Sequence, residues 1–371
     1  MGMTDCDVAV IGAGVIGAAV TQELVSRGAS VTLLDSRGAG LGATQAAAGM
    51  LVPYVEGFGR PLLPLAAASL NQYDAFVERV SRDSEVRIGY HRTGSLQVAT
   101  TGAQQEELQN TADAAHAWGV DCQHLDAEGA RQAEPLLAPG VSHALLVPTH
   151  GFVVAADLSG ALLALAIKRG ANVSIPERAR RIERAGDGVR VHLENGRVTA
   201  RHVVLAAGSW CGQIAIDGVP PVPVRPVRGQ LLQLAWDGPA LKRIVWAVRC
   251  YLVPAGSGTV LVGATVEDVG FDERTTASGV RDLLEAACGV MPDLCRATFV
   301  GARAGLRPVT ADEMPFIGKS RKIPGLVYAT GHYRNGVLLA PLTARAVADL
   351  VLDNREDPLL AGASPQRFGE Y

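Results

Sequence analysis

Three glycines near the start of the chain have the spacing of a phosphate-binding loop. Gly12, Gly14 and Gly17 form the pattern G-x-G-x-x-G, with an apolar run before it and helical spacing after it. In such a loop the first glycine permits a tight turn, the second lets the backbone approach a pyrophosphate, and the third allows close helix–strand packing. The following helix would present free N–H groups and a partial positive charge to the phosphates. These residues therefore predict a dinucleotide site.

An acidic residue stands where the ribose of this dinucleotide would lie. Asp35 ends the next apolar segment, at about the 20-residue distance from the loop that the fingerprint requires. Its carboxylate can accept hydrogen bonds from both ribose hydroxyls and would repel a 2′-phosphate. NAD and FAD proteins share this unit. Two features favour FAD: a second strand that ends at Gly208, and small residues at 43–50 that would let a helix start lie against the pyrophosphate.

Other reactive residue types are scattered along the chain. The six cysteines include no C-x-x-C pair and no nearby histidine spacing that would indicate zinc, so we expect no metal site. We find no Ser/His/Asp constellation, which argues against a hydrolase. Scattered thiols without a secretory leader lead us to expect a cytoplasmic protein. The sequence contains no run of about 18 uncharged apolar residues, so we expect no membrane-spanning helix.

Composition and charge indicate a globular enzyme rather than a nucleic-acid-binding protein. The chain has 371 residues, of which 48% are hydrophobic and 42 are glycine, and this length is sufficient for two domains. The net charge of −3 includes no basic block. Arginines at 178–184 form the one dense positive cluster, which we interpret as a solvated connection between two strands.

The elements that must position these residues alternate between helix and strand. Apolar periodicity predicts helices at 15–27, 65–82, 104–118, 156–169, 278–290 and 337–352. It predicts strands at 7–11, 30–34, 94–100, 189–194, 197–201, 203–206, 229–236, 250–254, 259–265, 298–305 and 326–330. Four prolines between 220 and 226 mark a crossing between two domains.

These elements predict an α/β protein with an α+β second domain. We expect a doubly wound, Rossmann-like FAD-binding domain and a substrate domain built on an antiparallel sheet, interleaved in sequence. The FAD-binding domain is expected to comprise residues 1–85, 148–218 and 306–371. The substrate domain is expected to comprise residues 86–147 and 219–305.

Six short motifs carry a resemblance to a known family. They are Ala47–Leu51, Arg225–Gln230, Tyr251–Pro254, Gly263–Val266, Ala304–Pro308 and Gly331–Gly336. With these motifs the chain resembles the D-amino-acid oxidase superfamily of flavoproteins over essentially its whole length. It is most similar to the glycine oxidases of the thiamine-biosynthesis type. The last two motifs, in this order near the C-terminal end, are highly specific together.

The resemblance implies an oxidase with non-covalently bound FAD. Glycine or another small amino acid would be oxidised to its imine by hydride transfer to the flavin, and O2 would be reduced to hydrogen peroxide. The imine would hydrolyse to an oxo acid and ammonia, or serve thiazole formation. No nucleic acid or membrane partner is expected, and the resemblance leads us to expect a homo-oligomer.

Site residues follow from the resemblance position by position. FAD contacts are implied at Val15, Ile16, Asp35, Ser36, Ala43, Thr44, Ala48, Gly49 and Met50. The loop beneath the flavin is implied at His332, Tyr333, Arg334, Asn335, Gly336, Val337 and Leu338. Ala179 falls where the family touches adenine through its backbone.

Substrate binding is implied at Arg307, Tyr251 and Arg334. A guanidinium can bond both oxygens of a carboxylate, and a phenol can add one O–H donor. Purely structural roles are the alternatives to substrate binding: a surface salt bridge for Arg307, a core aromatic for Tyr251 and a backbone role for Arg334. His332 would either donate to the flavin pyrimidine or be a structural histidine. No general base is needed if the amine binds neutral.

Departures from the family pattern leave the preferred amine open. Arg249 stands where a histidine is often found, Ala255 where an arginine is common, and Val266 where a methionine occurs in a close relative. Sarcosine-type oxidases carry a flavin-linking cysteine near 305–306, and this chain has none there. A quinone-linked dehydrogenase and a non-catalytic flavoprotein remain as alternatives.

Overall fold

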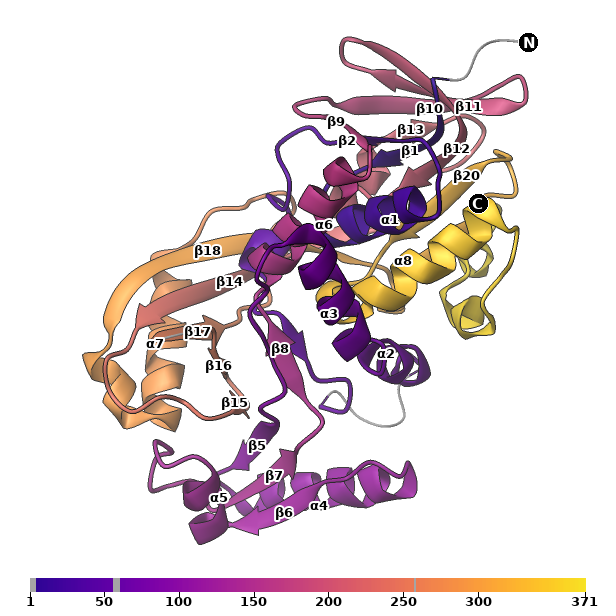
Figure 1. Ribbon diagram of the computed structural model, residues 1–371. Coiled ribbons are helices and arrows are strands. Elements are labelled where there is room, and N and C mark those ends of the chain that lie inside the picture. The colour runs from indigo at the N-terminus through magenta and orange to yellow at the C-terminus, as the bar shows by residue number, and fades with distance from the viewer. Residues whose placement is uncertain (1–4, 56–60, 257) are drawn as a thin grey trace.

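The computed structural model describes residues 5–55, 61–256 and 258–371, and it arranges them in two large sheets and one small one (Figure 1). The predicted mixed α/β class is confirmed. The assignment of individual segments to the two domains stays a prediction. Residues 1–4, 56–60 and 257 of those segments lie outside the described residues.

The first sheet has a parallel centre built from buried apolar strands. Its central order is β9-β2-β1-β12, with β20 parallel to β12 on the other side of its C-terminal half. The bounds are β1 (Cys6–Ile11), β2 (Val31–Leu34), β9 (Asn172–Ser174), β12 (Gly196–Leu205) and β20 (Leu326–Thr330). Antiparallel additions are β10 (Ala179–Ala185), β11 (Gly188–Leu193) and β19 (Phe316–Lys319), and β13 (Ala215–Ile216) pairs with β10.

Helices cover one face of this sheet, as Figure 1 shows for α1, α6 and α8. Alternate residues of β1 explain this, because Val8 and Val10 belong to the helix-side core whereas Ala9 and Ile11 belong to the core on the other face. Strands buried on both faces are typical of parallel sheets. The helices are α1 (Val15–Ser26), α2 (Leu63–Leu70), α3 (Tyr73–Ser84), α6 (Ala155–Lys168) and α8 (Gly336–Leu352).

The second sheet is antiparallel except where β15 pairs in parallel with β5. Its order is β18-β14-β17-β16-β15-β5-β7-β6. The bounds are β5 (Ser95–Ala99), β6 (Gln123–Asp126), β7 (His143–Val147), β14 (Arg225–Ala235), β15 (Ile244–Trp246), β16 (Tyr251–Pro254), β17 (Thr259–Gly263) and β18 (Thr298–Val309). Three helices accompany it: α4 (Gly102–Ala117), α5 (Ala127–Ala133) and α7 (Ala277–Val290).

Short elements join the two large sheets. A small sheet of β3 (Met50–Leu51), β4 (Tyr90–His91) and β8 (Gly151–Val153) lies between them. Short 3-10 helices occur at η1 (Ala43–Ala46), η2 (Gly208–Gln213), η3 (Pro292–Arg296), η4 (Pro358–Ala363) and η5 (Pro365–Phe368).

One predicted helix and two predicted strands need correction. The helix expected at 65–82 is divided into α2 and α3, because the Gln72 N–H bonds to the Ser69 carbonyl three residues back instead of continuing the helical pattern. Next to this turn, the hydroxyls of Ser69 and Tyr73 donate to the carbonyls of Leu338 and Val337 at the start of α8. The strands expected at 197–201 and 203–206 are one strand, β12. Its first half pairs antiparallel with β11 and its second half pairs parallel with β1 and β20.

The arginine cluster at 178–184 is a strand and not the connection that we expected. Arg180, Arg181 and Arg184 lie on β10, which pairs with β11. Arg180 forms an ion pair with Glu194, and Arg181 forms one with Asp217. Nearby carboxylates therefore compensate part of this charge, which weakens the nucleic-acid alternative further.

Candidate active site

A cavity of about 790 Å³ runs between the first sheet and the second. Its wall contains all three predicted substrate residues and all the predicted cofactor residues except Gly17 and Leu338. Gly17 packs instead against the backbone of Gly12, and Leu338, in the first turn of α8, is buried in the core. A volume in this range suits a small-molecule or cofactor site.

The glycine loop forms one end of this cavity because side chains are excluded from it. Gly12 has a φ of +107°, and a Cβ atom there would lie 2.4 Å from the carbonyl oxygen of Ala206 on the neighbouring strand end. A Cβ on Gly17 would lie 1.7 Å from the carbonyl oxygen of Gly12. Gly14 precedes α1 and has room beside it, since a Cβ there would meet only the Thr44 hydroxyl, at 3.5 Å.

Asp35 has a role in this loop that the sequence did not reveal. Its Oδ2 accepts a hydrogen bond from the backbone N–H of Ala13, at 2.7 Å, within the glycine loop. Its Oδ1 accepts from the N–H groups of Arg37 and Gly38. The carboxylate therefore links the glycine loop after β1 to the turn after β2 by hydrogen bonds. This link lies on the part of the cavity wall where the ribose is predicted to bind.

Sequence reasoning missed Arg37 and Trp210, which also line the cavity. The Arg37 guanidinium lies 4.2 Å from the centroid of the Trp210 ring and forms an ion pair with Glu273, beyond β17. Such stacking stabilises a cation over an aromatic face. No sequence signal could have found this pair, because Arg37 and Trp210 lie far apart in the chain.

Arg307 lies at the other end of the cavity and is held by the sheet. It is inside β18, opposite Val227 of β14, rather than in the segment after the strand as we expected. One nitrogen, Nη1, donates to the carbonyl oxygen of Thr265 at 3.0 Å and to that of Arg228 at 3.4 Å. The salt bridge suggested as an alternative is absent from the contacts of the described residues. The guanidinium is therefore fixed by neutral acceptors and keeps its charge for a ligand.

Tyr251 faces this guanidinium from β16. Burial raises the pKa of the phenol, and the neighbouring Arg307 and Arg334 charges oppose that rise. The phenol is therefore protonated at neutral pH and available as an O–H donor. Its ring also lies against Trp246, at 5.6 Å between centroids, so it packs as an aromatic residue as well as facing the cavity.

The C-terminal loop brings a second arginine to the same end. Arg334 is exposed, and its guanidinium lies 5.0 Å from the ring of Tyr333, whose φ is +48°. Burial and then the Arg334 charge lower the pKa of Arg307. Two cations this close repel one another, and an anion bound between them relieves that repulsion.

His332 is satisfied as a structural residue. It is 3% exposed, its Nε2 lies 3.2 Å from the hydroxyl of Thr343 on α8, and burial lowers its pKa to about 3. The imidazole is therefore neutral at physiological pH. It also lines the cavity, so the flavin contact proposed for it stays a prediction.

The three departures from the family pattern lie at different places. Arg249 is on the cavity wall, is 60% exposed at its side chain, and lies 3.6 Å from Glu285 of α7. Val266 lines the cavity with 56% exposure. Ala255 packs on a small buried cluster and is not part of the wall. Only the first two residues can touch a substrate from the wall.

Neither a metal centre nor a membrane-spanning helix is found in the described residues. No group of three or more His, Cys, Asp or Glu side chains is arranged to hold a metal ion in residues 5–55, 61–256 and 258–371. In the same ranges no helix has both the length and the apolarity needed to cross a bilayer.

Gly229 makes room for the Arg307 side chain, and this leads to a prediction. A Cβ on Gly229 would lie 2.1 Å from Arg307 Nη2, so Gly229→Ala must displace the guanidinium. An arginine tip can move at small energetic cost, so we expect nearly unchanged thermal stability. Because the displaced group is misaligned with substrate, KM should rise about tenfold.

Steady-state kinetics and thermal unfolding would test this expectation. Gly301→Ala is the matched control, since no atom lies within 4 Å of a Cβ at that position of β18. An unchanged KM in Gly229→Ala would contradict the assigned position of Arg307.

Two buried histidines predict loss of stability in mild acid. Burial lowers the pKa of His150 and that of His332 to about 3, from an ordinary value of 6.5. Between pH 6.5 and 3 the unfolded chain binds protons that the folded protein does not, so the free energy of unfolding falls as pH decreases. From pH 6.5 to 5 the loss is about 2 kcal/mol per histidine.

Urea unfolding at pH 7.5 and pH 5, at one fixed FAD concentration, would measure this loss. His150→Gln should lose about 2 kcal/mol less than the wild type over this interval. Exposed His124 offers the control His124→Gln, which should follow the wild type. The interpretation is wrong if His150→Gln and the wild type show equal pH dependence.

Comparisons with known proteins agree with this geometry. The profile of the family described as DAO, FAD dependent oxidoreductase, matches residues 7–350. The glycine oxidase of Geobacillus kaustophilus is 35% identical over 93% of this chain and 92% of that protein. The bifunctional protein ThiO/ThiG of a Synechocystis species is 34% identical over 98% of this chain, which spans 54% of that relative's length. The crystal structure of glycine oxidase from G. kaustophilus has a TM-score of 0.94 and 36% identity, covering 98% of both chains.

Proposed function

The chain belongs to the DAO family of FAD-dependent oxidoreductases, and we propose that it is a glycine oxidase-like amino-acid oxidase. Its substrate is glycine or another small amino acid, which it oxidises to the imine while O2 is reduced to hydrogen peroxide. The imine then yields an oxo acid and ammonia. Full-length relatives named glycine oxidase support this reaction.

One observation carries the substrate assignment. Arg307 and Tyr251 lie next to one another in the wall of a cavity that the predicted dinucleotide loop also lines. A carboxylate bound by the guanidinium and the phenol would be held within the same cavity as the cofactor. This arrangement suits a small amino acid better than a neutral amine, which offers the arginine no partner.

The chain's own residues orient and bind the substrate. Arg307 stays protonated and pairs with the carboxylate through the nitrogens that its backbone contacts leave available, and Tyr251 donates its phenolic proton to the same group. Arg334 adds positive charge at the cavity end. Restricting the substrate in this way aligns its Cα–H bond with the cofactor, which is the main contribution of a protein to such a reaction.

The residues of the other end fit FAD. The glycine loop and the start of α1 would hold the pyrophosphate, Asp35 the ribose, the backbone near Ala179 the adenine, and the loop after β20 the flavin. FAD, when bound, supplies the two-electron acceptor that O2 regenerates. The glycine loop is consistent with FAD because only glycine fits at positions 12 and 17.

We propose that the FAD is held without a covalent bond. Cys250 is the one thiol in the described part of the cavity wall, and burial raises its pKa to about 12. A thiol that remains protonated at neutral pH is a poor nucleophile toward the flavin. A cytoplasmic location and a homo-oligomeric state are also proposals. The six free cysteines are consistent with the former.

Anaerobic flavin reduction would test the proposed function. Purified protein is mixed with glycine, sarcosine or D-alanine without oxygen, and the flavin absorbance is followed before and after air is admitted. Bleaching by glycine or D-alanine, followed by recovery in air with release of hydrogen peroxide, is the expected result. Preference for sarcosine would assign a secondary-amine oxidase, and failure to recover in air would assign a dehydrogenase.

Denaturing the same protein would separate the cofactor proposals. Yellow flavin should appear in the supernatant after acid precipitation, whereas flavin that remains in the pellet would overturn non-covalent binding. Protein that neither copurifies with flavin nor binds added FAD would overturn the cofactor assignment itself.

A further inference from the structure

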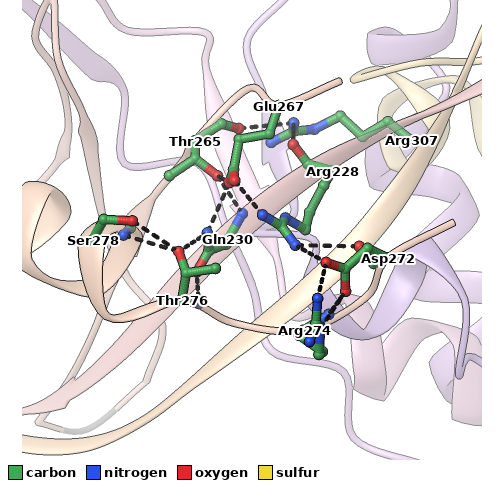
Figure 2. Close-up of polar contacts among 10 residues, drawn as sticks. Arg228, Gln230, Thr265, Glu267, Asp272, Arg274, Thr276, Ser278 and Arg307 are labelled. Atoms are coloured by element: carbon green, nitrogen blue, oxygen red, sulfur yellow. Dashed lines mark hydrogen bonds and ion pairs between the residues drawn. The ribbon is translucent and has the colours of Figure 1, made fainter. Parts of the chain in front are cut away.

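The Arg307 guanidinium donates hydrogen bonds to two backbone carbonyls from neighbouring segments. Nη1 donates to the carbonyl oxygen of Thr265, just after β17, and to that of Arg228, on β14. Figure 2 shows both residues beside Arg307, with Glu267 close to each of them. The orientation of Arg307 therefore depends on how these two segments are held relative to one another.

A single carboxylate joins the side chains of both residues. The Thr265 hydroxyl donates to Glu267 Oε1, and the Arg228 guanidinium forms an ion pair with Glu267 Oε2 (Figure 2). The side chain of Arg228 is only 4% exposed, and that of Glu267 is 26% exposed. A short, partly buried pair of this kind is expected to restrict both partners strongly.

The backbone repeats the same connection. The Arg228 N–H donates to the Glu267 carbonyl at 2.9 Å, and the Glu267 N–H donates to the Arg228 carbonyl at 3.0 Å. Thus the same Arg228 carbonyl oxygen accepts from both Glu267 and Arg307. A shift of Glu267 would move an acceptor of the guanidinium directly.

Gln230 fixes the carboxylate from a third direction. Its side-chain nitrogen donates to Glu267 Oε1 at 2.8 Å and to the Thr276 hydroxyl at 3.0 Å, and its side-chain oxygen accepts from the Thr276 N–H. Thr276 is the N-cap of α7. Glu267 Oε1 therefore accepts from two donors, which an amide at this position could not satisfy while also pairing with Arg228.

We infer that Glu267 is a positioning residue for the substrate carboxylate, acting through Thr265 and Arg228 on Arg307. The inference rests on the proposed function for the identity of the substrate. Glu267 does not line the cavity, so it acts without touching the ligand. Its charge offsets that of Arg228, which does not line the cavity, whereas Arg307 does and is free to meet the carboxylate.

Binding of acetate to the FAD-loaded enzyme would test the inference without requiring turnover. Acetate carries the carboxylate but no oxidisable amine, and its binding is followed through the flavin absorbance. Glu267→Gln should raise the Kd for acetate, and KM for the amino acid, about tenfold, because bonds to a charged acceptor are lost. FAD content should be unchanged and kcat should change less than KM.

Matched variants separate positioning from a general loss of structure. Asp272 also pairs with Arg228, at 3.1 Å, but no contact joins it to Thr265 among the described residues, so Asp272→Asn should bind acetate like the wild type. Thr265→Val removes the hydroxyl that donates to Glu267 and should weaken acetate binding. Thr265→Ser keeps the hydroxyl and should bind acetate like the wild type.

The outcomes distinguish this inference from the proposed function. If both Glu267→Gln and Thr265→Val bind acetate within about twofold of the wild-type affinity, the positioning role is wrong. Loss of hydrogen bonds to a charged group should weaken binding by more than about twofold. If Glu267→Gln does not fold, the Thr265 pair decides. A wild type that binds no acetate would overturn the carboxylate clamp and the inference with it. A wild type that binds acetate but oxidises no amino acid would overturn only the proposed function.

Discussion

Arg307→Ala should lower kcat/KM for the amino-acid substrate by about two to three orders of magnitude, because truncating one partner of a buried charge pair costs 2–5 kcal/mol. The flavin should remain bound and yellow. Arg307 belongs to β18 in the second sheet, whereas the glycine loop that would bind the pyrophosphate belongs to the first. Most of the loss should appear in KM, and the Kd for acetate should rise in parallel.

The matched control is Arg303→Ala, which removes an exposed arginine from the same strand. This variant should retain wild-type kinetics. Stopped-flow reduction at several substrate concentrations separates binding from the redox step. An Arg307→Ala enzyme that saturates at wild-type substrate concentrations would show that the carboxylate binds elsewhere.

Alanine at Gly17 and alanine at Gly14 should have different consequences in the same loop. A Cβ on Gly17 would lie 1.7 Å from the backbone oxygen of Gly12, which cannot move without displacing the loop. Overpacking against fixed atoms costs 1–3 kcal/mol or more, so Gly17→Ala should lower Tm by several degrees, about 2–4 °C for each kcal/mol. FAD binding should be lost with the loop geometry.

Gly14→Ala should instead fold normally and bind FAD more weakly. A Cβ at this position meets only the Thr44 hydroxyl, at an ordinary 3.5 Å, and otherwise faces the cavity. The methyl group would occupy space that the pyrophosphate needs, and we expect an affinity loss of about 10- to 100-fold.

Thermal unfolding of the apoprotein and FAD titration would measure both effects. Gly28→Ala is unsuitable as a control because its φ is +89°, whereas Gly160→Ala introduces a Cβ on α6 with no atom within 4 Å. Equal loss of apoprotein stability in Gly14→Ala and Gly17→Ala would contradict the separate roles assigned to the two glycines.

Local patterns identified most of the first sheet. The motif at Gly12–Gly17 marked the turn between β1 and α1, and continuous apolar runs marked the parallel strands, because each of these features depends on neighbours close in sequence. Errors arose where distant partners decided the element. Where α2 and α3 meet, the hydroxyls of Ser69 and Tyr73 bond to the start of α8, and the length of β12 depends on three partner strands.

The candidate residues were found in a similar way, but their relations were not. Resemblance to a family located Arg307, Tyr251 and the loop after β20, all of which line one cavity. It did not indicate that Gly229 leaves space for the guanidinium or that Asp35 ties the glycine loop. These are contacts between strands and turns far apart in the chain, and spacing along one segment carries no information about them.

By itself, then, the sequence determined the glycine-rich turn between β1 and α1, the mixed α/β class and the residue types that could bind a carboxylate. The spacing of the glycines and the apolar runs of the buried strands can be recognised locally, since each is a pattern among residues close in sequence. Only the tertiary structure decided how the residues of the proposed carboxylate site are brought together. Arg307 comes from β18, Tyr251 from β16 and Glu267 from beyond β17, and antiparallel pairing of these strands through β14 brings the three together.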